Sequence, residues 1–132
     1  MQFRAYIYIA GEGFDPDEFN RNLPSDMKGT VHTTKKVGAG RKPAVGFKYW
    51  MSAMIDVRSE HPEETLYRIL FPIKEYLKEI QNISNIMIKA TVVGNFKNAN
   101  AVQGLFLPND LIQLLAEVGA GVDFDLVWSP ES

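Results

Sequence analysis

Apolar and polar residues between positions 107 and 128 follow first a helical pattern and then a strand pattern. Pro108 suits the first helical position and Gly119 the left-handed end of the predicted helix. From Val122 to Trp128, apolar residues occupy every second position, which predicts a strand with one buried face. A helix therefore packs against a sheet. The apolar helix face comprises Leu111, Leu114, Leu115 and Val118, at i, i+3, i+4 and i+7.

The N-terminal segment predicts a strand and a short helix. Apolar residues alternate with larger polar or charged ones between positions 3 and 9. Asp15 can cap a helix whose first residue is Pro16, and Leu23-Pro24 ends it. The face of the strand turned away from its aliphatic residues carries Arg4, Tyr6 and Tyr8.

Two more strands are predicted between positions 30 and 58. Residues 30–37 are polar and rich in β-branched side chains, which is typical of a strand at a sheet edge. Residues 47–58 carry the longest alternating pattern, which favours a central strand. In this alternating pattern, the more polar face of the strand carries Lys48, Trp50 and Asp56.

The second half of the chain predicts a long helix and two paired strands. Residues 62–80 hold a helical apolar stripe that contains Pro72, so we expect a kink or a split there, because proline has no N–H to donate. Residues 86–93 predict a strand, residues 94–100 a hairpin loop and residues 101–106 the returning strand.

The order of these elements predicts an α+β fold. Strands that follow one another without a helical crossover between every pair favour a mostly antiparallel sheet. We expect about five to six strands, with two main helices and one short helix packed on one face, in a single domain over residues 1–132. The other face would then be free for a partner, and its predicted partner-binding residues are Arg4, Tyr6, Tyr8, Lys48, Trp50, Asp56, Asp123 and Asp125.

The amino-acid composition limits the classes of protein to which the chain can belong. The chain has 132 residues and no cysteine, so it forms no disulfide. Its net charge of -2 disfavours a protein that holds nucleic acid by charge alone. The N-terminus enters a strand pattern directly, with no signal peptide, and no apolar run approaches the roughly 18 residues needed to span a membrane. We therefore expect a cytoplasmic protein that does not bind a membrane.

Catalytic and metal-binding patterns are weak. His32 and His61 are the only histidines, and neither has the spacing of a metal site. Asp123 and Asp125 point to one side of a strand and could hold a cation or act as acid and base, although a solvated strand face has the same pattern. We expect no metal, no cofactor and no enzymatic activity.

A basic, glycine-rich loop supports an alternative. Its cations and free backbone N–H groups could bind a phosphate, but it lacks the sequence of a phosphate-binding loop and leads toward a strand instead of a helix. Together with Tyr6, Tyr8 and Trp50, the loop could bind nucleic acid or a phosphate ligand. The cations of this loop are Lys35, Lys36, Arg41 and Lys42.

Several segments together resemble a known family. They are Tyr6-Ile7-Tyr8-Ile9-Ala10-Gly11, Phe14-Asp15-Pro16-Asp17-Glu18, Trp50, Leu115-Ala116-Glu117-Val118-Gly119-Ala120 and Val122-Asp123-Phe124-Asp125. They resemble a family of small bacterial proteins catalogued as domain of unknown function four-two-seven-nine. The resemblance implies a cytoplasmic single-domain protein, of a kind found near toxin systems, and transfers no active-site residue. Our leading hypothesis is a protein-binding domain, an immunity protein that neutralises a cognate toxin.

Overall fold

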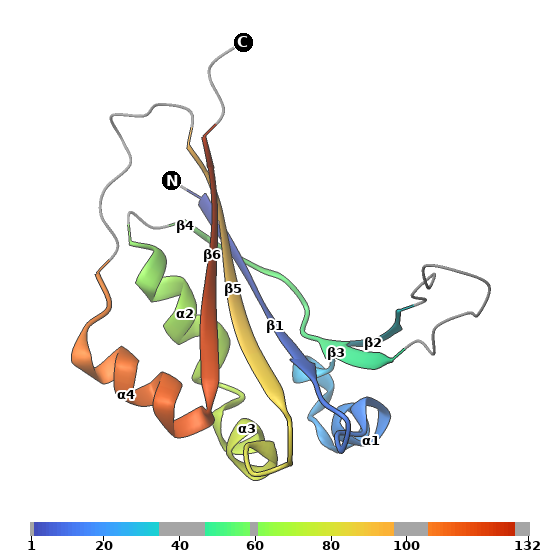
Figure 1. Ribbon diagram of the computed structural model, residues 1–132. Helices are drawn as coiled ribbons and strands as arrows, with labels where there is room; N and C mark the ends of the chain where they lie inside the picture. Colours follow the sequence, from blue (N-terminus) through green and yellow to red (C-terminus); the bar gives the residue numbers. More distant parts are fainter. Residues whose placement is uncertain (1, 35–46, 59–60, 97–105, 129–132) are drawn as a thin grey trace, which may run out of the picture.

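The computed structural model describes residues 2–34, 47–58, 61–96 and 106–128. Within these ranges the chain forms one sheet and four α-helices (Figure 1). The strands are β1 (Gln2–Ala10), β2 (Thr30–Thr33), β3 (Lys48–Met51), β4 (Ile55–Arg58), β5 (Met87–Phe96) and β6 (Ala120–Trp128). The helices are α1 (Pro16–Asn22), α2 (Pro62–Leu70), α3 (Lys74–Ile80) and α4 (Asn109–Val118), and a short 3-10 helix spans Ser25–Met27.

The sheet is mixed and mostly antiparallel, as the sequence predicts. Its strand order is β2-β3-β1-β5-β6, and β4 pairs with β1 beside β3. Only the pairing of β5 with β6 is parallel among the described strands, and α4 lies between these two strands in the chain. The strand expected at 101–106 lies outside the described residues except for Phe106, which is in no strand.

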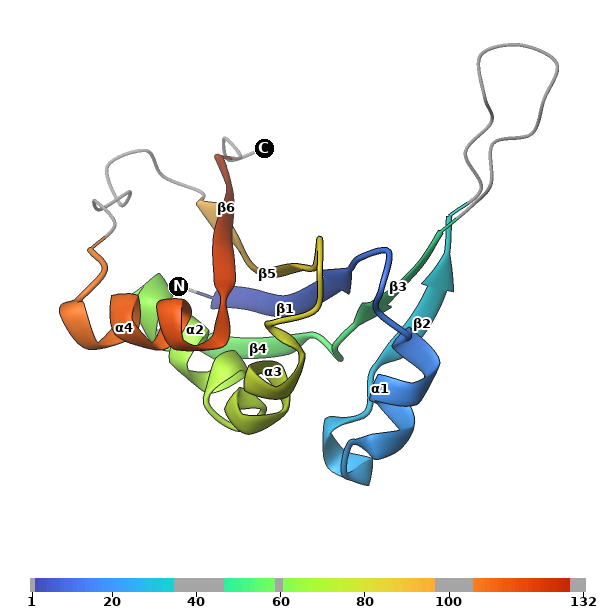
Figure 2. The same ribbon diagram turned by 60° about the horizontal axis from the view of Figure 1, so that its bottom comes forward.

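The helices cover one face of the sheet. In Figure 2 the helices gather on the lower side of the sheet, and α2 contacts both β1 and β5. Helix α1 packs under β3, and α4 packs beside β6. The inward side chains of β1 are almost completely buried, with at most 1% of their surface exposed: Phe3, Ala5, Ile7 and Ile9. The predicted α+β architecture and its one-sided helix layer are confirmed.

Helix α1 forms where its sequence predicts. The Asp15 Oδ1 atom accepts a hydrogen bond from the Glu18 N–H at 3.1 Å, which satisfies one of the free donors of the first turn. Pro16 is the first helical residue, and Leu23 is the C-cap. The rings of Phe14 and Phe19, whose centroids lie 5.5 Å apart, fix the entry of the chain into the helix.

The long strand predicted at 47–58 is divided in two. The Ile7 N–H donates to the Ser52 Oγ at 2.8 Å, and the Ser52 N–H donates to the Ile7 carbonyl at 2.9 Å. Tyr8 pairs with Met51, whereas Ala5 pairs with Ile55, so the register between β1 and its neighbours shifts by one residue. A one-residue shift reverses the faces of the side chains, as in a β-bulge.

This shift corrects the prediction for Trp50. Its side chain is fully buried on the helix side, where its ring meets the edge of Phe19 at 5.0 Å between centroids. The indole N–H donates to Asn20 Oδ1 at 3.0 Å, and the Gly29 N–H donates to the same oxygen at 2.9 Å. Trp50 is therefore a core residue and not part of an exposed face.

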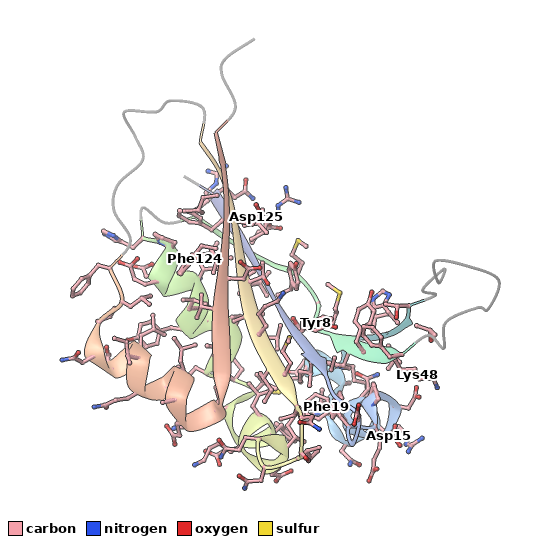
Figure 3. The ribbon with its side chains drawn as sticks, viewed as in Figure 1. Tyr8, Asp15, Phe19, Lys48, Phe124 and Asp125 are labelled. Carbon is pink, nitrogen blue, oxygen red and sulfur yellow. The ribbon has the colours of Figure 1, made fainter. Side chains whose placement is uncertain are left out.

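Lys48 needs the same correction, because it lies on the side of β3 that faces α1. Its Nζ atom is 3.1 Å from Asp17 Oδ2, and Figure 3 shows Lys48 near Asp15 and Phe19. The alternation of residues 47–58 was predicted in the wrong phase for β3, whereas Asp56 in β4 keeps the predicted phase because it follows the shift.

Three local details refine the second half. The predicted interruption at Pro72 is a split, since α2 ends at Leu70 and α3 begins at Lys74. Pro108 is the N-cap of α4 and not its first residue, whereas Gly119 ends the helix with a φ of 71° as expected. Gly94 lies within β5 and not in the predicted loop. A glycine is needed at this position, because a Cβ atom there would lie only 2.8 Å from Cε1 of the Phe3 ring.

Helices α3 and α4 are joined by an ionic contact. Glu117 Oε1 lies 3.1 Å from Lys78 Nζ and 3.3 Å from Lys74 Nζ. The hydrogen bond from Lys78 holds the pKa of the Glu117 carboxyl below its usual value, and the same bond raises the pKa of Lys78. The ionised Glu117 therefore favours the folded state.

We predict that Asn20→Ala lowers the free energy of unfolding by about 2 kcal/mol or more, since two donors lose one shared acceptor. Urea denaturation followed by circular dichroism measures this change. Asn22→Ala, an exposed position at the end of the same helix, is the matched control and should have little effect. An equal decrease in the free energy of unfolding for the two variants would show that the Asn20 contacts are not stabilising.

We also predict that Glu117→Gln destabilises the protein at neutral pH but not in acid. Because the folded pKa of Glu117 is depressed, its stabilisation is present above the unfolded pKa of about 4.3 and is lost as the pH falls through the folded pKa. Denaturation curves at neutral pH and near pH 3 measure the difference. Glu79→Gln on the exposed side of α3 should show no such pH dependence. A penalty that persists unchanged in acid would contradict the prediction.

Candidate interaction surface

The face of the sheet opposite the helices, here called the open face, carries six of the eight predicted partner-binding residues. Register places Arg4 opposite Asp56, and Tyr6 opposite Thr91, which in turn lies opposite Asp123. Figure 3 shows Asp125 and Phe124 on opposite sides of β6. The six residues on this face are Arg4, Tyr6, Tyr8, Asp56, Asp123 and Asp125.

An aromatic cluster crosses three strands at one end of the open face. The rings of Tyr8 and Tyr49 lie 5.1 Å apart between centroids, and Tyr49 stacks on His32 at 5.1 Å with an interplanar angle of 17°. Phe47 approaches Tyr49 at 6.1 Å. The contacts arise because β3 brings alternate residues to this face between β1 and β2. Tyr8, His32, Phe47 and Tyr49 are called the aromatic cluster below.

Sequence reasoning missed three members of this cluster. The predicted alternation places Phe47 and Tyr49 on the buried face of a continuous strand, and His32 is interpreted as a surface histidine of a strand instead of a metal ligand. A signal that could have found Tyr49 is its neighbour Trp50. Adjacent residues of a strand point to opposite faces, so a buried tryptophan turns the tyrosine toward the open face.

Lys89 links the aromatic cluster to β6. Its Nζ atom lies 5.5 Å from the centroid of the Tyr8 ring and 3.7 Å from Asp123 Oδ2. Burial raises the pKa of the Tyr8 hydroxyl, and the neighbouring Tyr49 raises it further, so Tyr8 is a neutral hydrogen-bonding group at neutral pH. Asp125 makes no ion pair with a described residue.

Two hollows flank the aromatic cluster. One has a volume of about 250 Å³ and is lined by Tyr6, Tyr8, Tyr49 and Lys89, among others. The other has a volume of about 470 Å³ and lies between Tyr8, Phe47 and Met87. Met87 is more than half exposed and Phe47 nearly so. This end of the open face thus combines apolar rings, tyrosine hydroxyls and one cation in shallow depressions.

The other predicted groups are not brought together. His32 stacks on Tyr49, whereas His61 is the N-cap of α2, with its Nδ1 atom 3.5 Å from Glu63 Oε1. Within the described ranges, no group of three or more histidine or acidic residues is arranged to hold a metal ion. The cations of the basic loop, Lys35, Lys36, Arg41 and Lys42, lie outside the described residues. No helix in the described part of the chain has the length and apolar character required to cross a membrane.

Comparison with known proteins assigns the chain to a family but does not assign an activity to it. No curated protein and no solved structure matches the chain. The family model described as domain of unknown function (DUF4279) matches residues 1–128, which is nearly the whole sequence. The segments that carried the resemblance all lie in this matched range. The chain therefore belongs to the DUF4279 family.

Proposed function

We propose that this chain is a non-enzymatic protein-binding domain that meets its partner with the open face. The observation that carries the proposal is the aromatic cluster, where one ring from each of three strands and the ring of Phe47, which precedes β3, gather on the side of the sheet without helices. Tyrosine is enriched at the energetic centre of protein interfaces, since it buries a large ring at a small entropic cost and keeps a polar group.

Charge on the open face supports a polypeptide partner in preference to a nucleic acid. Arg4 lies opposite Asp56, Lys89 is paired with Asp123, and Asp125 adds a negative charge that has no ion-pair partner in the described part of the chain. A phosphate backbone requires a predominantly positive surface, whereas a protein partner can match a surface of both signs. The described cations of this face are therefore poorly arranged for the alternative function as a nucleic-acid or phosphate-ligand binder.

The finer hypothesis is that the partner is a toxin and the chain its immunity protein. Its basis is the family resemblance together with the exposed, charged and aromatic face. In this hypothesis the chain covers the active site of the toxin, which requires a stable recognition surface and no catalytic group of its own. Such a complex would contain one copy of each protein and would have no toxin activity.

We predict that a photo-crosslinking residue in place of Tyr49 joins the chain to one polypeptide in an extract of its native host. The same residue in place of Glu79, which lies exposed on α3, is the control and should give no adduct of that size. Adducts of equal yield from both positions, or recovery of nucleic acid alone, would contradict the proposal.

With that polypeptide purified, Tyr8→Ser and Tyr49→Ser should each weaken its binding about ten-fold, as expected for aromatic residues at the centre of an interface. Titration calorimetry measures the affinity, and Glu79→Gln should leave it unchanged. Inhibition of a toxic activity by the wild-type chain, but not by the Tyr49→Ser variant, would identify the immunity function. A partner that the chain binds without inhibiting would contradict that function but leave the protein-binding proposal in place.

A further inference from the structure

The sheet ends at β6 in an edge that no described strand covers. Strand β6 pairs with β5 from Ala120 to Trp128, and within the described ranges no strand lies along its second edge. This edge is nine residues long. Successive residues of a strand turn their backbone groups to opposite edges, so about half of the N–H and C=O groups of β6 are directed away from β5. Such a row of groups can pair with another extended chain.

The two faces of β6 differ in chemistry. On the open face, Asp123 and Asp125 lie two residues apart and are both exposed. Asp123 Oδ2 lies 3.7 Å from Lys89 Nζ, whereas Asp125 makes no ion pair with a described residue. The edge therefore presents carboxylates on one face and apolar side chains on the other. The apolar residues of the helix side pack against the core but stay partly exposed: Val122, Phe124 and Leu126.

The elements around this edge add no cation close to it. Helix α4 packs beside β6 and contains Asp110 and Glu117 but no lysine or arginine. The two lysines of α3 that reach α4 are both held by Glu117. On the open face, Lys89 belongs to β5, about 10 Å from where an added strand would run. Arg4 lies one strand further away and opposite Asp56, so an added strand meets mainly negative charge.

We propose that the β6 edge binds an extended segment of a partner protein, in which basic and apolar residues alternate, as a further strand of the sheet. Residues that lie opposite one another in paired strands point to the same face, and in an antiparallel pair their Cβ atoms are about 5 Å apart. The basic residues of the segment therefore lie beside Asp123 and Asp125 on the open face. Its apolar residues lie beside Val122 and Phe124 on the helix side.

Other occupants fit this edge less well. A second copy of the chain that paired through its own β6 would bring Asp123 and Asp125 of both copies to the same face, and like charges in opposite positions destabilise a sheet. An acidic segment is repelled for the same reason. A segment of apolar residues alone leaves the carboxylates without a partner.

This inference rests on the proposed function, since Asp123 and Asp125 belong to the open face, and it adds which kind of partner segment is bound there. The aromatic cluster lies on β1, β3 and β2 and just before β3, whereas β6 is at the opposite end of the strand order (Figure 2). Variants of Tyr49 therefore report on the cluster, and variants of Asp125 report on the edge.

The test uses a fluorophore-labelled peptide of about seven residues with alternating lysine and valine and with blocked ends. We expect saturable binding to the full chain in fluorescence anisotropy. A peptide of the same composition with its lysines and valines in separate blocks carries the same charge but cannot place them on separate faces. It should bind about ten-fold more weakly, and so should an alternating peptide with a central proline, which lacks a backbone donor.

Two variants with the same change of charge assign the site. Asp125→Lys should weaken binding of the alternating peptide about ten-fold, because it places a cation opposite the lysines of the peptide. Glu79→Lys, at an exposed position on α3, should leave the affinity close to that of the wild type. Both side chains are exposed, so the thermal unfolding midpoint should stay close to the wild type in both variants.

Hydrogen exchange shows whether the peptide pairs with the backbone. At a saturating concentration of the alternating peptide, exchange of the β6 amides should become slower, because their outward N–H groups gain acceptors. Exchange of β2, the strand at the other end of the strand order, should not change. Slower exchange at β2 alone, or at neither strand, would overturn the proposal.

Equal affinity for the alternating and block peptides would also overturn it, and so would equal weakening by Asp125→Lys and Glu79→Lys or the absence of saturable binding at millimolar peptide. A dimer of the chain with protected β6 amides would overturn it in favour of self-pairing. If the peptide fails to bind while a crosslinker at Tyr49 still captures a polypeptide, the edge inference fails and the proposed function stands. Peptide binding at β6 without a captured polypeptide would support the edge and contradict the role of the aromatic cluster.

Discussion

The two hydrogen bonds between Ser52 and Ile7 decide which side of β3 faces the core. They replace regular ladder pairing at this point, and the register of β1 with its neighbours shifts by one residue. Trp50 consequently enters the core and meets Asn20, while Tyr49 turns outward to join Tyr8. Without this shift the tryptophan would be exposed and the aromatic cluster would not form. The bulge thus determines both the packing of α1 and the character of the open face.

Local signals in the sequence were sufficient for most of the helices. Asp15 and Gly119 define helix ends by their own backbone and side-chain chemistry, which depends on a few neighbouring residues. The α+β class also followed, because it depends on the order of elements. The sequence could not reveal the phase of residues 47–58, since apolar and aromatic residues occur on both sides of that alternation. The choice between faces depends on hydrogen bonds to Ile7 and Asn20, which lie far away in the sequence.

The same limit explains what was missed in the candidate site. Tyr6, Tyr8 and Asp125 were found because a strand with one aliphatic face has only one other face to offer. His32 and Tyr49 meet only through the pairing of β2 with β3, and Tyr8 joins them only because β1 pairs with the other edge of β3. Relations of this kind belong to the assembled sheet. Single-sequence patterns describe each strand separately and therefore do not contain them.

The position of β1 in the sheet has a consequence for the order of folding. Its edge partners β4 and β5 lie roughly fifty and eighty residues further along the chain, and α2, which contacts its aliphatic side, lies between them in sequence. Contacts across such separations form late, because a long loop must close before they contribute. The strand in the middle of the sheet therefore gains its neighbours late in folding, and a chain truncated before β5 would leave it open to association with other chains.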